Sequence, residues 1–444
     1  MYKASSKNIL SIFGFLIFFQ MPYNYGFKEI NFMFDARQKV LPNGIRLISI
    51  KKDTQVTSIH TGVKIGAIFE SPEEKGISHF IEHMLFKGTK TKTNEQLNLD
   101  LEALGGEYNA YTDNDCTVYS ITALREELEK SLELLSDMLI NSTFPEAEIG
   151  KERDVILSEI RTSKDDVEDY SFKRINEMAF MKSPLKYETI GDEKTVNRMD
   201  REKLVNFYDK YYVPNNCFIS IVSSYEHEHI YNLVCKYFKE WLWKEFKRQE
   251  VIVENNIPGL KVSYKKDIEQ STILYLFTFY DITKEEELAL RILNHKFGES
   301  ANSILFRKLR EEKGLAYDVY TDLDLTTNVK TLYIYTAVSD ENVDETINTI
   351  NNCIEEIKNE NILFDDSTIG LMKKVLKTAV AFTLEDSTDI GNYVLHQAID
   401  EDDIFKFAYD MKKLESIRKE DIYNVAKVVF ENPTIHILKS EDNR

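Results

Sequence analysis

The sequence predicts an α+β fold built from two similar α/β-sandwich domains, in each of which helices pack on an antiparallel or mixed sheet. Three observations support this prediction. The chain has 444 residues, which is more than one ordinary hydrophobic core requires. Segments with strand and helix periodicity alternate or cluster along it. A short stretch near the N-terminus also recurs in the middle of the chain, which indicates a duplication.

The composition is that of a folded globular protein, with 43% hydrophobic and 30% charged residues. Its formal net charge of −19 argues against nucleic-acid binding, which requires basic patches. The sequence has no G-x-x-x-x-G-K-[ST] loop, so nothing in it indicates nucleotide binding. The four cysteines form no CxxC pair, which is typical of proteins in a reducing compartment. We therefore expect a cytoplasmic location.

Residues 1–32 form an N-terminal extension that allows three interpretations. Lys3 and Lys7 precede an apolar run from Ile9 to Phe19, which is typical of a signal peptide or membrane anchor and would make the protein exported or membrane-anchored. No A-x-A-like cleavage site follows, and Met33 opens a stretch that resembles the start of a folded domain, so Met33 is a second candidate for the true start. The third interpretation is an ordinary packed or frayed segment.

Local signals mark the elements of the first domain, which is predicted over residues 33–245. Alternating apolar residues predict a strand within residues 56–70. Thr93 and Gln96 form a capping box at the start of a helix that ends at Gly105 and Gly106. The other predicted elements are a short helix within residues 77–89, a strand pair over 106–124, and helices over 125–141 and 146–163.

A charged segment that ends in Pro-Gly, residues 246–259, is the predicted linker to a second domain over residues 260–444. The two halves begin alike, because LPNGIRLISIKKD at residues 41–53 resembles IPGLKVSYKKD at residues 257–267. Each stretch has a Pro–Gly entry, a short β run and Lys-Lys-Asp. The second domain is therefore expected to be a homologue of the first.

The stretch ISHFIEHMLFKGT, Ile77 to Thr89, places three metal-capable groups among large apolar residues. His79 and His83 are four residues apart, so on a helix they share a face and can direct ring nitrogens at one ion. Two imidazoles suit zinc, and Glu82 lies close enough to that face to reach a water beside the metal. This is the H-x-x-E-H pattern, the inverse of the common metalloprotease motif.

A zinc site of this kind needs a further protein ligand from elsewhere in the chain. The helix after Pro145 carries Glu152 and Glu159, which are seven residues apart and therefore share a face. One carboxylate can bind the metal while the other supports it. In the second half, His295 stands roughly where the motif would be, without a histidine or glutamate at helical spacing. The second domain is thus predicted to lack zinc.

These residues resemble the zinc metallopeptidases of the pitrilysin, insulin-degrading enzyme and mitochondrial processing peptidase group, and most of all the single-length bacterial processing-peptidase-like branch. In that family the last ligand follows the second histidine by about 76 positions, and here 159 − 83 = 76. The resemblance implies one zinc ion per chain, held by His79, His83 and Glu159, with Glu152 as a supporting catalytic glutamate. It also implies two homologous domains that face each other across a cleft.

Two further stretches resemble substrate-binding segments of the same family. The stretch GGEYNAYTDNDCTVY, residues 105–119, resembles its substrate strand and implies that Asn109, Ala110 and Thr112 bind substrate. In the second half, LFRKLREEKGLAYDVY at residues 305–320 resembles its arginine–tyrosine segment and places Arg310 and Tyr317 on the substrate. Two turns depart from the family pattern, at residues 297–303 and 223–224, and they concern substrate preference.

The expected function is that of a zinc-dependent endopeptidase. It would hydrolyse peptides or unstructured segments enclosed in a chamber, with Glu82 as the catalytic general base that activates a water. The resemblance also implies a homodimer, because single-length relatives need two chains to enclose a chamber.

Two alternatives to an active peptidase stay open at this stage. The chain could be a non-catalytic scaffold of the same fold, or a partner subunit that binds substrate for another catalytic chain. The intact zinc residues argue against the scaffold, and the presence of both the zinc motif and the arginine–tyrosine motif argues against the partner subunit. One more histidine-rich stretch, Glu226 to His229, is expected to be a solvated loop, because histidines two residues apart diverge on a helix.

Overall fold

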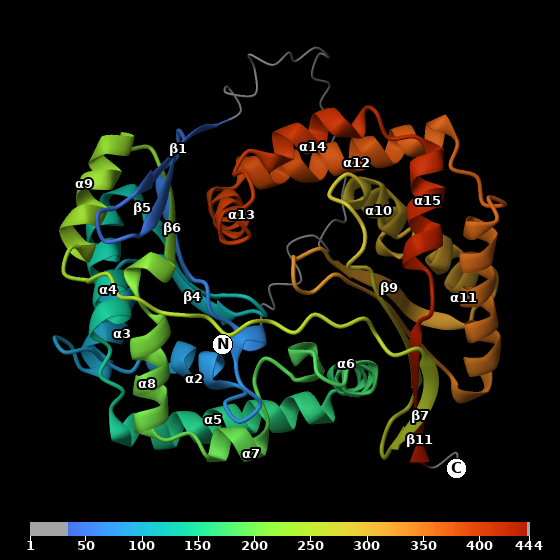
Figure 1. Ribbon diagram of the computed structural model, residues 1–444, viewed down its shortest axis with the longest axis horizontal. Coiled ribbons are helices and arrows are strands. Elements are labelled where there is room, and N and C mark those ends of the chain that lie inside the picture. Colours follow the sequence, from blue (N-terminus) through green and yellow to red (C-terminus); the bar gives the residue numbers. More distant parts are fainter. Residues whose placement is uncertain (1–33, 442–444) are drawn as a thin grey trace. The chain divides into compact units, whose positions relative to one another are not determined.

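The computed structural model describes residues 34–441, so the predicted extension at residues 1–32 lies outside the described residues. The chain divides into two compact units, and each contains one sheet (Figure 1). The first unit takes in the residues up to Ile160, Glu188–Glu250 and Ala379–Ala408. The second takes in Arg161–Tyr187, Val251–Thr378 and the residues from Tyr409 onwards.

The first unit holds a six-stranded mixed sheet with the order β1-β2-β6-β3-β5-β4. Strands β2 and β6 are parallel, and every other neighbouring pair is antiparallel. Strand β6 is buried along its whole length, as expected for the apolar run at the centre of a sheet. The strands are β1 Asp35–Val40, β2 Arg46–Lys51, β3 Val56–Val63, β4 Glu107–Thr112, β5 Thr117–Leu124 and β6 Cys217–Ser223.

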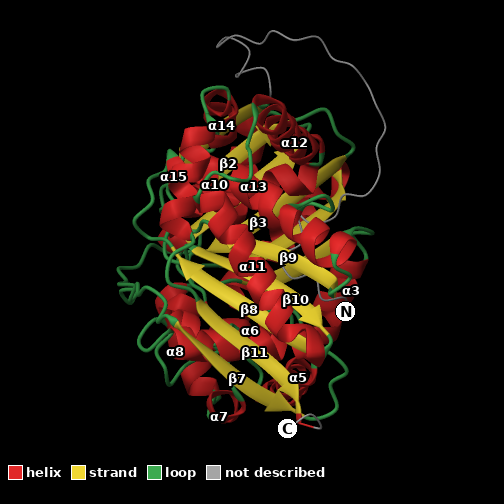
Figure 2. Ribbon diagram, turned by 90° about the vertical axis from the view of Figure 1, so that its right-hand side faces the viewer, coloured by secondary structure: helices red, strands yellow, loops and turns green. Residues whose placement is uncertain are grey.

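The second unit repeats this topology with five strands in the order β7-β11-β8-β10-β9, which lie side by side in Figure 2. Strands β7 and β11 are parallel and the other pairs antiparallel, so each strand has a counterpart at the same place in the first sheet. The strands are β7 Gly259–Lys265, β8 Ser271–Thr278, β9 Ala316–Asp324, β10 Thr331–Val338 and β11 Thr434–Ser440. The predicted α+β class with two similar domains is confirmed.

Helices cover both sheets. Those of the first unit are α2 Ile77–Met84, α3 Asn94–Glu102, α4 Leu128–Asn141, α7 Glu193–Asn197, α8 Arg201–Tyr211, α9 His227–Phe238 and α13 Ser387–Ile399. Those of the second unit are α6 Val167–Ala179, α10 Glu286–Asn294, α11 Val343–Lys358 and α15 Lys419–Val429. Helices α5 Glu146–Asp165, α12 Asp366–Glu385 and α14 Lys406–Leu414 each include a unit boundary. Within residues 34–441 no helix is both long and apolar enough to span a bilayer.

The predicted division into two continuous domains needs correction in two segments. The boundary after Glu250 falls inside the predicted linker, residues 246–259. However, residues 161–187 belong to the second unit, because helix α6 packs on its strands β8 and β11. Residues 379–408 belong to the first unit, because helix α13 packs on β3 and β6. Each half of the sequence therefore supplies one helix to the sheet formed by the other half.

The predicted strand within residues 56–70 is correct only in its first part. Strand β3 ends at Val63, and Ala67–Phe69 forms a 3-10 turn. The N–H groups of Ala67 and Ile68 donate to the backbone carbonyls of Asp113 and Asn114, which draws the chain onto the turn between β4 and β5. A Cβ at Gly66 would lie 2.4 Å from the carbonyl oxygen of Asp113, so only glycine fits at this close approach.

Candidate metal centre

Helix α2 presents its histidines from a firmly packed position. Ile77, Phe80, Ile81 and Met84 are fully buried and anchor one face of the helix in the core. The N-terminus of α2 is held by the buried carboxylate of Glu70, which accepts hydrogen bonds from the backbone N–H of Gly76 at 2.9 Å and of Ser78 at 2.8 Å. The polar residues of the motif lie on the other face and are thus fixed in orientation.

His79, His83 and Glu159 come together although 76 residues separate the second histidine from the glutamate. One ligand atom from each lies within 4.8 Å of the others. The Oε2 atom of Glu159, from helix α5, is 3.9 Å from Nε2 of His79 and 3.7 Å from Nε2 of His83. The ring centroids of the two histidines are 4.7 Å apart. Three donor atoms therefore lie close together, as expected for the ligands that the family resemblance implies.

The three residues fit a zinc ion. Ligands of tetrahedral zinc with bonds of about 2.0–2.1 Å lie roughly 3.4 Å from one another, so the observed separations need only small adjustments. Burial, together with neighbouring His83, lowers the pKa of His79 to about 3, which keeps the imidazole neutral and able to bind a metal. The Nδ1 atom of His79 is buried and has no hydrogen-bond partner among the described residues.

Glu152 contacts His83 and orients its ring. It is one of the few buried carboxylates of the first unit, and its Oε2 atom is 3.1 Å from Nδ1 of His83. The ammonium of Lys87 approaches its other oxygen at 2.8 Å. Burial raises the pKa of Glu152, but the hydrogen bonds from His83 and Lys87 outweigh burial and leave the pKa lowered. The ionised Glu152 thus fixes the His83 ring with Nε2 close to the other two donor atoms.

The same groups act on His83 itself. Burial lowers the pKa of this histidine, but the hydrogen bond with Glu152 and the nearby carboxylates of Glu82 and Glu159 outweigh it, so that the pKa is raised. A metal ion therefore has to displace a proton from His83, so the affinity of the site for metal should fall as the pH falls.

Glu82 is a carboxylate made more basic by its surroundings. Burial raises its pKa, and a hydrogen bond from the hydroxyl of Thr112, at 2.7 Å, partly offsets this rise. Thr112 lies at the end of β4, so the substrate strand and the motif helix meet at this bond. The sequence assigns Thr112 to substrate binding and gives no sign of its bond to Glu82, nor of the bond between Lys87 and Glu152.

Strand β4 lies at the edge of the first sheet, and within the described residues its only strand partner is β5. Asn109 is exposed and Ala110 and Thr112 are partly exposed, so these three positions are accessible to another chain. The side-chain oxygen of Asn109 accepts a hydrogen bond from the N–H of Ala110 at 2.9 Å. An edge strand of this kind can accept a peptide as an additional strand.

Arg310 and Tyr317 lie together in the second unit. Arg310 is part of a π-helix, Phe306–Glu312, and its guanidinium stacks over the rings of Tyr317 and Phe306, with 4.9 Å to each centroid. Tyr317 is the second residue of β9, and 75% of its surface is exposed. The ring of His295, the counterpart of the motif histidines, lies 3.4 Å from the carboxylate of Glu299.

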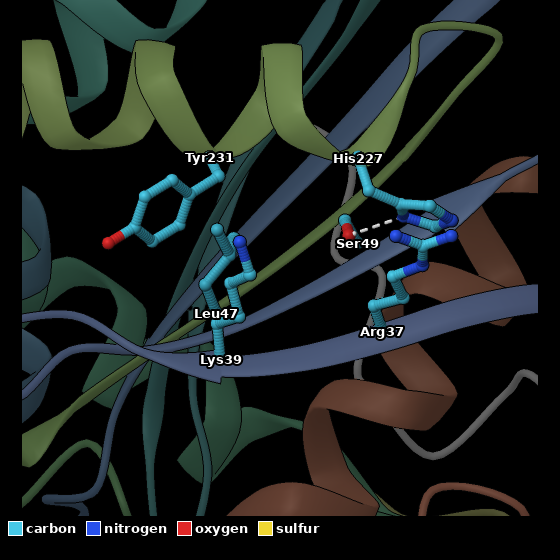
Figure 3. A pocket seen from close by; sticks show the side chains of 6 residues that line it. All are labelled: Arg37, Lys39, Leu47, Ser49, His227 and Tyr231. Carbon is cyan, nitrogen blue, oxygen red and sulfur yellow. Dashed lines mark hydrogen bonds between the residues drawn. The ribbon is translucent and has the colours of Figure 1, made fainter.

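The expectation of a solvated loop at Glu226–His229 is wrong for His227. Helix α9 begins at this residue, and its ring is buried beside β2, where Nδ1 is 2.7 Å from the hydroxyl oxygen of Ser49 (Figure 3). Asp35 lies 3.0 Å from Nε2 of the same ring. The neighbouring cavity measures only about 10 Å³, which is room for one water molecule, so this cluster does not form a ligand site.

A helix carrying H-x-x-E-H, whose histidines meet a glutamate from a separate helix, defines the class of inverted-motif metallopeptidases. Sequence comparison agrees with this class. Residues 46–193 match the family described as Insulinase (Peptidase family M16), and residues 198–367 match the family described as Peptidase M16 inactive domain. The chain belongs to peptidase family M16.

Curated relatives and solved structures extend this result over most of the chain. A protein of Rickettsia felis named "Uncharacterized zinc protease" is 30% identical over 405 residues, which cover 89% of this chain and 95% of the relative. A protein of the same name from Rickettsia bellii is 31% identical over 91% of this chain and 97% of its own length. The crystal structure of a protease from Helicobacter pylori shares the fold, with a TM-score of 0.84 and 20% identity over 91% of this chain and 99% of that one.

Proposed function

We propose that the protein is a zinc-dependent endopeptidase that hydrolyses peptides or unstructured segments of proteins. The observation that carries this proposal is the proximity of His79, His83 and Glu159 to one another, beside the partly buried carboxylate of Glu82, whose pKa is raised. A non-catalytic scaffold would have no use for this set of groups. The names of the relatives, zinc proteases, support the same activity.

His79, His83 and Glu159 would hold one zinc ion per chain. When bound, zinc supplies Lewis-acid chemistry, because it polarises the scissile carbonyl and lowers the pKa of water towards neutrality. Glu152 keeps the His83 ring in place through its bond to Nδ1, and Lys87 keeps Glu152 ionised.

Glu82 would act as the general base. Its carboxylate accepts a proton from the attacking water and passes it to the nitrogen of the leaving amine. The raised pKa makes this carboxylate a better proton acceptor than an exposed glutamate, and the hydroxyl of Thr112 holds one of its oxygens in place.

The peptide would bind along the open edge of β4, beside Asn109, Ala110 and Thr112, as an added strand. This mode recognises the peptide backbone and favours extended, unfolded segments over folded ones. Arg310 and Tyr317 are proposed to bind the substrate and to stabilise charge that develops on the carbonyl oxygen. Their mutual stacking and the exposure of Tyr317 support a role at a surface rather than in a core.

The proposal includes a homodimer, whose two chains would enclose the substrate in a chamber, and a cytoplasmic location. Both follow from the resemblance to single-length family members and from the cysteine content.

Incubation of the purified protein with a mixed peptide library, with and without a chelator, tests the proposed activity. Mass spectrometry should find internal cleavage products that disappear with the chelator and return when zinc is added. Cleavage that persists in the chelated protein, or no cleavage by protein shown to contain zinc, would contradict the proposal.

A further inference from the structure

A second group of metal-capable side chains lies in the first unit, apart from the residues of the first site. Asp115 and Cys116, at the turn between β4 and β5, meet His396 from helix α13. One ligand atom of each residue lies within 4.8 Å of the others. Cys116 is fully buried and Asp115 is 6% exposed, so these donors lie inside the fold rather than on a solvated face.

The turn that carries Asp115 and Cys116 is held rigidly. The N–H of Asp113 donates to the carbonyl of Cys116 at 2.8 Å and closes the turn. Its carbonyl accepts a hydrogen bond from Ala67 at 3.1 Å, and the carbonyl of Asn114 accepts one from Ile68 at 2.8 Å. Two donors on a turn fixed in this way are positioned in advance of any ligand.

His396 is oriented by a hydrogen bond with a tyrosine, and metal-binding histidines commonly have their second ring nitrogen held by a hydrogen bond. The hydroxyl of Tyr111 lies 2.7 Å from Nε2 of His396 and donates its hydrogen to the side-chain oxygen of Asn392, also at 2.7 Å. A tyrosine hydroxyl has one hydrogen only, so Nε2 of His396 must be the donor in the other bond. This fixes the tautomer and leaves the lone pair on Nδ1, the form in which imidazole binds a metal.

We propose that Asp115, Cys116 and His396 form a second, structural site for a zinc-type divalent cation, which clamps helix α13 to the turn beside the substrate strand. A thiolate, an imidazole and a carboxylate together are a donor set that zinc accepts. Asp400 follows His396 by four residues and interacts electrostatically with both Asp115 and His396, which makes it a candidate for a fourth ligand.

A cysteine nucleophile is a poor explanation of the same residues. Cys116 has no exposed surface, so no substrate can reach its sulfur. A cation, in contrast, would neutralise the negative charge of the carboxylates and the thiolate. It would also explain why a helix from the far end of the sequence carries polar groups onto this part of the first sheet.

Cobalt(II) titration of the full-length, metal-free protein tests this site directly. Cobalt bound by a thiolate gives an intense sulfur-to-metal charge-transfer absorption in the near ultraviolet, whereas cobalt bound by His79, His83 and Glu159 has no sulfur ligand and gives none. We expect this band in the wild-type protein and two zinc ions per chain after reconstitution. Cys116→Ser should lose the band and retain one zinc ion.

Cys217→Ser is the matched control, because Cys217 is similarly buried, lies on β6 of the same unit and is not part of the group. This variant should keep the band. His396→Gln, at a partly exposed position, should weaken cobalt binding at this site about tenfold or more, since it removes the imidazole ligand. The proposal would be overturned by the absence of the band in the wild type, by a band that survives Cys116→Ser, or by unchanged cobalt affinity in His396→Gln. If Cys116→Ser fails to fold, the affinity of His396→Gln decides the question.

Discussion

At the scale of single residues, the bond between Thr112 and Glu82 makes a testable prediction about pH. The hydrogen bond from Thr112 stabilises the ionised form of Glu82, so Thr112→Val should raise the pKa of Glu82 further. Loss of a bond to a charged group costs about 1.5–3 kcal/mol, which corresponds to roughly one to two pH units. The acid limb of the kcat/KM profile should therefore move to higher pH. Thr112→Ser keeps the hydroxyl and should leave the acid limb unchanged. An acid limb that does not move in Thr112→Val would show that Thr112 does not set the pKa of Glu82.

Glu152 supports a second prediction at this scale. Glu152→Ala removes the hydrogen bond to Nδ1 of His83 and leaves Lys87 without its partner. Zinc affinity and kcat should fall by about 10–100-fold without loss of the site. Glu148 lies one turn earlier on the same helix and pairs with Asn94 and Lys151, so Glu148→Ala is the matched control and should change neither. Equal zinc affinity in Glu152→Ala and the wild type, measured by competition with a chelator, would refute the assignment.

How far the sequence predicts this site depends on the distance between residues along the chain. His79, Glu82 and His83 lie on one short helix, so their spacing alone indicates their common face. Glu152 and Glu159 come from a separate helix, and spacing left both open as the ligand until the family resemblance selected one. The bond of Thr112 to Glu82 joins a strand to a helix 30 residues away. Such a contact depends on how the chain packs, and no local pattern reveals it.

At the scale of elements, the packing of helix α13 on the first sheet predicts sensitivity to acid. The ring of His60, on β3, lies against α13, since a Cβ at Gly391 would be 2.9 Å from its Nδ1. Burial and then His396 lower the pKa of His60 to about 3. The unfolded chain binds this proton near pH 6.5, so stability is lost as the pH falls below that value. From about pH 7 to about pH 5 the loss should be ~2 kcal/mol.

Hydrogen exchange of the α13 amides, corrected for the intrinsic pH dependence, measures this effect. Protection should fall between the two pH values in the wild type and change much less in His60→Gln. His295→Gln, in the second unit, is the control and should behave as the wild type. Equal acid sensitivity in the two variants would show that His60 is not the cause.

The elements themselves follow closely from local signals, whereas their assignment to the two units does not. The capping box of Thr93 and Gln96 is formed as predicted, and the strands of the 106–124 pair flank a turn. The unit to which α6 and α13 belong could not be predicted from local signals, because each helix packs on strands formed by residues distant in the sequence. Likewise, the alternation of Val63, Ile65, Ala67 and Phe69 suggested a longer strand, but the contacts of Ala67 and Ile68 with the 113–116 turn end it.

At the scale of the whole molecule, the two sheets show one design used twice with different chemistry. The strand order β2-β6-β3-β5-β4 of the first sheet corresponds to the order β7-β11-β8-β10-β9 of the second, and corresponding neighbours are parallel or antiparallel alike. Within the described residues, however, both groups of metal-capable side chains lie in the first unit. The second unit carries the stacked pair Arg310 and Tyr317 instead. We propose that after a duplication only the first unit kept metal binding, while Arg310 and Tyr317 of the second unit came to assist in substrate binding.

This division predicts the effect of a substitution in the second unit. Arg310→Ala should leave zinc content and the melting temperature unchanged, because the Arg310 side chain is exposed and its guanidinium stacks on two aromatic rings. Peptide turnover should fall about tenfold or more, since a charge that stabilises the reaction is lost. Arg307, on the same π-helix, provides the control as Arg307→Ala. Wild-type kinetics in Arg310→Ala would remove the second unit from catalysis.

The central claim, that Glu82 is the base and Glu159 a ligand, is tested most directly by measuring zinc stoichiometry and peptide hydrolysis on the same samples. Glu82→Gln keeps the shape of the side chain but cannot accept a proton, so it should retain one zinc ion at the first site and lose about 10²–10⁴-fold in rate. Glu159→Ala and His79→Ala should lose the metal from that site. His295→Ala should change neither quantity. Normal peptide cleavage by Glu82→Gln, or wild-type zinc affinity in Glu159→Ala, would contradict the account.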